Sequence, residues 1–231
     1  MADQDDPQGQ TRSRLAVVVS HHGPVALACA AELVATDSSL HVVVVGDGSP
    51  TPDVTLADVV AAHGPVAVAV VVPHIGVPGR AAEPGADDVA TATSVVAAVA
   101  PAMVAAGDGR IVLVSEVTGV PGRTWEDGSG AAMWGLVGLA RSAARDLARS
   151  GVTVNVVRAG VVATPELEQA RADDPAVVAA VDAAVAATPL RRLATVEDVA
   201  AAVAYLASAE ASYVTGLVLP VDGGLAMGLG T

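Results

Sequence analysis

The chain has 231 residues, of which 52% are apolar, and this length fits one domain with a full hydrophobic core. Its 25 acidic and 12 basic side chains give a formal net charge of −13, and such a surface repels nucleic-acid phosphates and anionic lipid headgroups. We therefore expect neither nucleic-acid nor membrane binding.

The polar first 13 residues predict a disordered tail, followed by one domain over residues 14–231. The apolar runs are short and are interrupted by Gly, Pro or charged residues, so we predict no signal peptide and no transmembrane span, and we expect a cytoplasmic protein. Cys29 is the only cysteine and lies in an apolar helical pattern, which indicates a buried and inert thiol.

From residue 14 onward, short apolar runs alternate with longer Ala-rich stretches. The apolar runs predict strands at 15–20, 41–45, 66–72, 110–115, 152–157 and 217–221. The Ala-rich stretches predict helices at 24–36, 55–63, 86–106, 129–150, 175–187 and 196–208. This alternation is typical of an α/β fold with a Rossmann-like, doubly wound parallel sheet of six strands. The long segment 159–192 is expected to hold only short helices and to cover the ligand crevice.

Four stretches in the second half of the chain resemble the sequences of a known protein family. They are GRIVLVSEVTG (109–119), the 129–150 helix, SGVTVNVVRAGVVAT (150–164) and PLRRLATVEDVAAAVAYLASAEASYVTGLVLPVDGG (189–224). Together they resemble the short-chain dehydrogenase/reductases, especially the ketoreductases that act on acyl carrier protein. The resemblance implies this fold and hydride transfer between NAD(P) and a carbonyl or alcohol.

The resemblance also implies four catalytic positions, and each holds a different residue here. The family's Ser becomes Glu116, its Tyr becomes Ser129, its Lys becomes Met133 and its Asn becomes Asp88. The chain contains no Lys in any position, so a Tyr-x-x-x-Lys pair is impossible in any alignment register. A serine hydroxyl without a neighbouring ammonium cannot supply a pKa near the working pH.

The nucleotide-binding turn departs from the family pattern as well. The stretch VSHHGPVA (19–26) places Ser20, Pro24 and Ala26 at the family's glycine positions. Pro24 removes a backbone N–H from the phosphate cradle, so we expect no cofactor. The interval from Gly46 to Pro73 is only 27 residues, whereas the family needs roughly twenty more, so we predict that a helix and an edge strand are shortened or missing.

The favoured hypothesis is a non-reductase pseudoenzyme that serves in biosynthesis as an oligomeric partner or a small-molecule-binding subunit. The expected assembly is a homodimer, a homotetramer or a hetero-oligomer with an active ketoreductase. On the 129–150 helix, a face of small and apolar residues suits packing across a two-fold axis, and the alternative is that it packs on its own sheet. That face comprises Leu136, Leu139, Ala140, Ala143 and Ala144.

A second hypothesis is a cofactor-independent cyclase, dehydratase or isomerase. It would use Glu116 together with His74, Asp127 or Ser129 as acid and base. Trp125 and His22 would then bind a flat, polyketide-like ligand, whereas Trp134, on the long helix, is expected to have a packing role. No third ligand accompanies His21 and His22 at a fixed spacing, so we expect no metal. A third hypothesis is an atypical NAD(P)-dependent ketoreductase.

Overall fold

The structure is a computed structural model. It describes residues 14–20, 23–46, 55–73, 75–79, 86–117 and 129–227. The predicted N-terminal tail lies outside these ranges.

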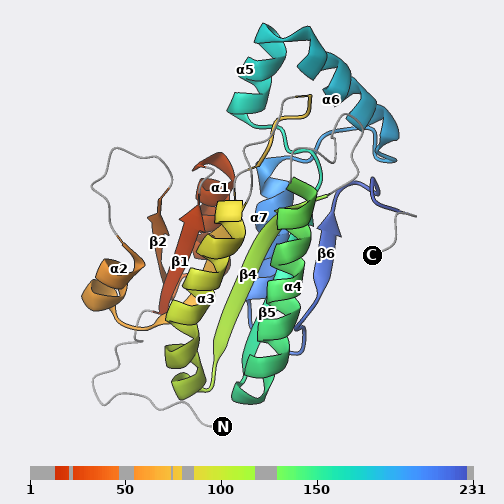
Figure 1. Cartoon of the computed structure of the whole chain (residues 1–231). Coiled ribbons are helices and arrows are strands. Elements are labelled where there is room, and N and C mark those ends of the chain that lie inside the picture. The colour runs from red at the N-terminus through yellow and green to blue at the C-terminus, as the bar shows by residue number, and fades with distance from the viewer. Residues whose placement is uncertain are drawn as a thin grey trace.

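Six parallel strands form one sheet, as the sequence predicts. The strands are β1 (Arg14–Ser20), β2 (Leu40–Val45), β3 (Val66–Val72), β4 (Gly109–Glu116), β5 (Val152–Ala159) and β6 (Val218–Val221). Their order in the sheet is β2-β1-β3-β4-β5-β6. The carboxyl ends of all six strands therefore share one edge, which is the upper edge in Figure 1.

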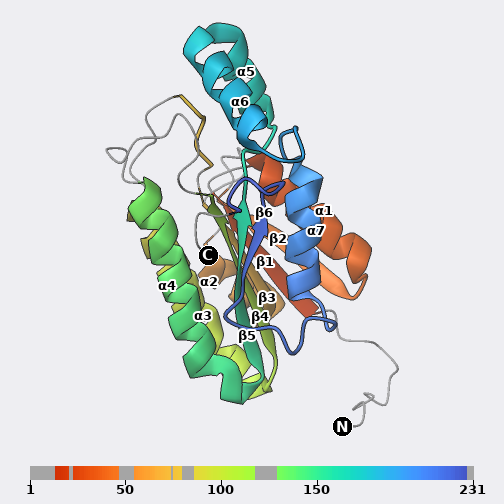
Figure 2. The ribbon, with the colours of Figure 1, turned by 90° about the vertical axis from the view of Figure 1, so that its right-hand side faces the viewer.

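Helices cover both faces of the sheet (Figure 2). One layer contains α1 (Gly23–Thr36) and α7 (Val196–Ala207), and the other contains α2 (Leu56–His63), α3 (Ala86–Ala106) and α4 (Ser129–Leu147), which continues into a 3-10 turn at Ala148–Ser150. The helices α5 (Pro165–Asp173) and α6 (Pro175–Ala187) lie beyond the carboxyl edge of the sheet (Figure 1). The α/β fold with a doubly wound parallel sheet is confirmed.

The strands carry apolar side chains toward both layers. On β4, Ile111 and Leu113 join the core under α3 and α4, while Val112 and Val114 join the core under α1 and α7. All four are at most 1% exposed. Because both faces are covered by helices, the sequence shows continuous apolar runs rather than alternation.

The shortened region between β2 and β3 is visible in the strand order. β3 pairs directly with β1, and β2 forms the outer edge of the described sheet. Between β2 and β3, the described residues contain α2 as the only helix. The structure therefore contains the predicted sheet of six strands, in which β2 is the outer strand next to β1.

Helix α3 is long and apolar enough over Asp88–Ala106 to cross a bilayer, judged by length and composition alone. In this fold it packs against β3, β4 and α4 as one of the helices that cover the sheet. A core helix of a soluble domain passes the same test, so we assign α3 to the covering layer.

Gly151 ends the α4 segment with a left-handed φ of 74°. A Cβ atom at Gly151 would collide with the carbonyl oxygen of Gly107, whereas a Cβ at Gly107 itself, also left-handed at φ 70°, would meet nothing within 4 Å.

We expect Gly107→Ala to lower the free energy of unfolding by about 1–2 kcal/mol, because an L residue disfavours this backbone conformation. Gly151→Ala adds a backbone collision to the same penalty and should cost about 4 kcal/mol or more. Urea denaturation of both variants checks this difference. Equal losses of unfolding free energy in the two variants would contradict this, because they would show that the backbone at Gly107 moves away from the new Cβ atom without cost.

Candidate functional site

The order of strands changes direction between β1 and β3, and in open α/β sheets ligands bind outside the carboxyl ends at such a point. Ser20, the last residue of β1, is 1% exposed and pairs with Val72 at the end of β3. Helix α1 begins at Gly23, so Pro24 lies in its first turn and offers no N–H there. Ala26 is fully buried, and its methyl group packs in the core under α1 and α7.

Glu116 ends β4 and is only 8% exposed. Its Oε1 atom accepts a hydrogen bond of 2.9 Å from the backbone N–H of Gly76, in the loop that follows β3. The Glu116 carboxylate thus ties this loop to the end of the neighbouring strand. The side chain does not point into bulk solvent, which meets one geometric condition of the acid–base hypothesis.

Met133 occupies the position of the family's lysine, one turn into α4. It is 3% exposed, and its sulfur accepts the backbone N–H of Glu116 at 3.1 Å. A thioether carries no titratable proton and no charge, so it cannot hold a nucleotide ribose or lower the pKa of a neighbouring hydroxyl. Asp88, at the position of the family's asparagine, is 5% exposed on α3.

Most of the other predicted site residues lie outside the described residues. This holds for His22, His74, Trp125 and Asp127. Ser129 is the first residue of α4, but its side chain is not described. Their proposed grouping with Glu116 therefore stays a prediction.

The two tyrosines of the chain lie far from this edge. Tyr205 is 47% exposed on the last turn of α7 and Tyr213 is fully exposed. The last turn of α7 lies at the amino end of the sheet, since Ser208 accepts a hydrogen bond from Arg110 at the start of β4. Neither tyrosine substitutes for the family's catalytic one.

Asn155 has a structural role in β5. It is fully buried, its amide nitrogen donates to the Val214 carbonyl at 2.9 Å, and its amide oxygen accepts the Leu217 N–H at 3.1 Å. Cys29 is also fully buried, and burial raises the pKa of its thiol to about 12. The predicted burial of the thiol is confirmed.

Sequence reasoning missed Arg158, the penultimate residue of β5. Its side chain is 5% exposed, and its Cζ atom lies 5.8 Å from the centroid of the Trp134 ring on α4. Trp134 itself is 47% exposed, so the packing role expected for it is partial. The signal was available, because Arg158 is the one charged residue in the apolar strand VTVNVVRA.

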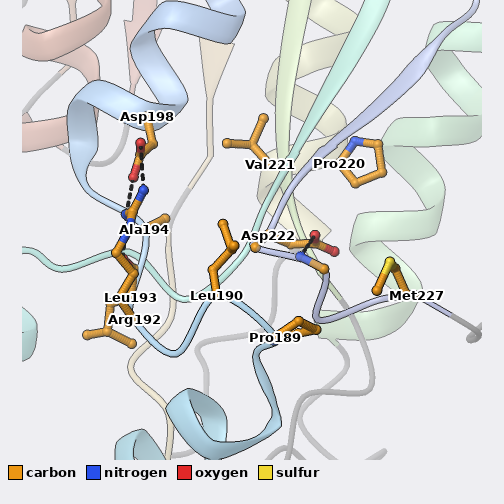
Figure 3. A pocket seen from close by; sticks show the side chains of 12 residues that line it. Pro189, Leu190, Arg192, Leu193, Ala194, Asp198, Pro220, Val221, Asp222 and Met227 are labelled. Atoms are coloured by element: carbon orange, nitrogen blue, oxygen red, sulfur yellow. Dashed lines mark hydrogen bonds and ion pairs between the residues drawn. The ribbon is translucent and has the colours of Figure 1, made fainter.

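A pocket of about 490 Å³ lies beside β6 (Figure 3). Its walls are mostly apolar and come from the segment before α7, the end of β6 and the turn that follows. They include Leu190, Leu193, Pro220, Val221 and Met227. None of the predicted site residues lines it.

One wall of this pocket carries an ion pair between Arg192 and Asp198 (Figure 3). The hydrogen bond from Arg192, followed by the one from the Thr195 backbone N–H, lowers the pKa of Asp198 to about 2. Asp198 also forms a capping box with Thr195 at the N-terminus of α7. This pair is therefore fixed in place and ionised near neutral pH.

Comparisons with known proteins agree with the fold. A family model described as Enoyl-(Acyl carrier protein) reductase matches residues 88–226. The 3-oxoacyl-[acyl-carrier-protein] reductase MabA of Mycobacterium avium is 37% identical over 120 residues, which are 52% of this chain and 45% of the relative. The corresponding reductase FabG of Escherichia coli is 39% identical over 132 residues, or 56% and 51% of the two chains. The matches thus span about half the length of these curated relatives.

Among solved structures, the TT0495 protein from Thermus thermophilus superposes with a TM-score of 0.75 at 24% identity. The superposition covers 94% of this chain and 99% of that one, and at this identity it shows the fold alone. The family model spans more than half of the chain, and its match runs from α3 to the turn after β6. The chain belongs to the short-chain dehydrogenase/reductase family and is similar to its 3-oxoacyl-acyl-carrier-protein reductases.

Proposed function

We propose that this member of the family does not reduce carbonyls, and that it acts as an associating, ligand-binding subunit. The observation that carries the proposal is Met133. A buried thioether, bonded to the Glu116 backbone, stands where a lysine ammonium would be needed, and the chain has no lysine that could replace it. Without that charge, neither Ser129 nor another hydroxyl has a means of becoming a proton donor near neutral pH.

The distribution of the similarity supports the loss of nucleotide binding. The family model matches from residue 88 onward, whereas the structural likeness to TT0495 covers 94% of the chain. The first half has thus kept the fold with a sequence outside the family-model match. It holds the β1–α1 turn, where Pro24 replaces an N–H that would face a pyrophosphate.

The proposed association surface lies on α3 and the first half of α4. The exposed residues of this α3–α4 surface are all uncharged: Ala90, Thr93, Ser94, Ala97, Ala98, Pro101, Val104, Ala105, Ala131, Trp134 and Gly138. The two helices lie side by side (Figure 1), with a Cβ atom at Gly135 placed 3.0 Å from Val89. In a chain of net charge −13, a long uncharged surface of this kind is typical of a protein interface.

The partner we propose is a second copy of this chain. Two copies of α3 and α4 would meet as an isologous four-helix contact, in which small side chains allow close approach. The small-residue face predicted on α4 is not the surface used, since Leu136, Ala140 and Ala144 are at most 4% exposed and pack on the chain's own sheet. Internal packing, the alternative raised for that face, accounts for these three residues.

Glu116 fits a structural role in this account. Its carboxylate fixes the loop at Gly76, and its backbone N–H fixes Met133, so the residue joins β4, the loop after β3 and α4. We therefore favour the associating subunit over the cofactor-independent acid–base enzyme, because both printed hydrogen bonds of Glu116 are structural.

The direct test is an assay of hydride transfer. The purified chain is mixed with NADPH and a 3-oxoacyl thioester, and the loss of NADPH absorbance is followed, with the E. coli FabG reductase as the positive control. We expect no turnover above the buffer rate. Turnover with a rate within about a hundredfold of the control would overturn the proposal, since losing a proton donor alone costs about 10²–10⁴-fold.

A further inference from the structure

Arg158 is a buried cation for which the described part of the chain holds no counter-ion. Among the described residues no hydrogen bond or ion pair reaches its guanidinium, and its Nε atom is buried with no partner. A buried charge is ordinarily paired, because removing a guanidinium from water without compensation is strongly unfavourable. An arginine that the described residues leave without a counter-ion, at the carboxyl edge of a Rossmann-like sheet, is placed where such folds bind ligands.

The position of Arg158 in β5 defines the surroundings of the guanidinium. Val154 and Val156 of the same strand face α3 and α4, whereas Val157 and Ala159 face the opposite layer. Arg158 alternates with the latter two and lies under Trp134, so it is on the α4 side of the sheet.

Arg158 pairs with a polar residue on the neighbouring strand β4 and with an apolar residue on the neighbouring strand β6. Ser115 on β4 is fully buried, and its hydroxyl makes only a long contact of 3.4 Å to the Glu116 carbonyl. Pro220 on β6 lines the apolar pocket of about 490 Å³. A hydroxyl, a guanidinium and an indole face thus lie together on the α4 side of the carboxyl edge, and the pocket touches this row of residues only through Pro220.

We propose that Arg158 anchors a small oxyanion, a carboxylate or a phosphate group, in this site. The planar guanidinium matches two oxygens of such a group, and Ser115 is placed to donate a further hydrogen bond. Trp134 covers the site and packs against the ligand. The site deepens the ligand-binding role proposed above and rests on it, but it does not involve the β1–α1 turn.

The test measures thermal unfolding of the full chain at constant ionic strength in chloride, phosphate and benzoate, with neutral benzamide as the uncharged counterpart of benzoate. A ligand that binds the folded state raises the midpoint even when its Kd is in the millimolar range. General salt effects act on every variant alike, so the informative quantity is the difference between variants. Phosphate tests for a phosphate-binding site, and benzoate tests for a site that binds a carboxylate.

We expect phosphate or benzoate, but not benzamide, to raise the midpoint of the wild-type protein. Arg158→Met should lose this shift, with a Kd at least tenfold weaker, and Arg158→Lys should keep part of it. Arg141→Met, on the exposed side of α4, serves as the matched control and should respond like the wild type. Circular dichroism confirms that each variant is folded.

Equal shifts in the wild type and in Arg158→Met, or no shift with either oxyanion, would overturn the proposal. A weakened oligomer in Arg158→Met, measured by sedimentation, would also overturn it, because the counter-ion would then be a carboxylate of a second copy. The hydride-transfer assay reports separately on the proposed function, since neither phosphate nor benzoate binding depends on NADPH.

Discussion

Replacing Arg158 by methionine is expected to raise the free energy of unfolding of the unliganded protein by about 1–3 kcal/mol, as replacing buried charged groups by apolar ones of similar volume often does. Arg158 has no counter-ion among the described residues and is 5% exposed, so the folded state gains little from its charge and bears the cost of its desolvation. Methionine has a similar length and fills much of the same volume. A buried charge that lowers stability without a structural role is the pattern expected of a binding residue.

Arg110 provides the matched comparison, because it is also a buried arginine in a strand, at 7% exposed. Its guanidinium donates to Asp108 Oδ1 at 2.7 Å, to the Gly109 carbonyl at 2.9 Å and to the Ser208 carbonyl at 3.2 Å. Arg110→Met removes the donor of all three hydrogen bonds and should lower the free energy of unfolding by about 2–4 kcal/mol.

Urea denaturation of both methionine variants, in a buffer without phosphate or carboxylates, measures the contrast. Opposite signs are expected at Arg158 and Arg110. A loss of similar size at both positions would show that Arg158 is held by structural contacts, and would remove the stability argument for a binding site.

The second large effect concerns the α3–α4 surface. Ala97 lies in the middle of the exposed, uncharged side of α3, and Ala97→Arg would place two like charges near each other across a two-fold axis. We expect this single change to weaken self-association at least roughly a hundredfold, since facing like charges cost several kcal/mol at an interface.

Sedimentation velocity over a range of concentrations measures this effect. Ala172→Arg makes the same substitution on an exposed position of α5, outside the α3–α4 surface, and should leave the assembly unchanged. A wild-type chain that stays monomeric at all concentrations, or an Ala97→Arg variant that still dimerises normally, would contradict the proposed interface. Assembly only in the presence of an intact ketoreductase would favour the hetero-oligomer.

The sequence predicts the regular elements of this fold well. The six predicted strands coincide with the observed ones within two residues at each end, because runs such as VAVAVVV are buried on both faces and bounded by Gly, Pro or charged residues. The short interval between Gly46 and Pro73 also predicts the reduced edge of the sheet, since 27 residues cannot hold the family's extra helix and strand.

Other features depend on tertiary contacts that no local pattern contains. The stretch PELEQARAD shows little apolar periodicity, and α5 forms because Thr164 caps it and because Leu167 and Ala170 pack against α6. On α4, small residues fit an external interface and an internal one equally well, and only the burial of Leu136 and Ala140 decides between them. Arg158 was missed because the sequence does not show whether the guanidinium of a strand arginine has a counter-ion in the folded protein.

The candidate site was predicted in part. Glu116 is buried at the carboxyl edge, as the alignment with the family's serine position implies, and Met133 lies next to it. The hydrogen bond from Gly76 to the Glu116 carboxylate could not be predicted, because the loop after β3 differs from the family's and its path depends on the shortened first half.

The central claim is that the chain has the family's fold without its cofactor, and a titration with NADPH tests it most directly. Protein fluorescence or calorimetry would follow the titration, with the E. coli FabG reductase as the positive control. The account predicts no saturable binding, with a Kd weaker than about 1 mM, equivalent to a binding free energy weaker than about −4 kcal/mol. A micromolar Kd for NADPH would contradict it, because the β1–α1 turn would then still bind the pyrophosphate despite Pro24 in the first turn of α1.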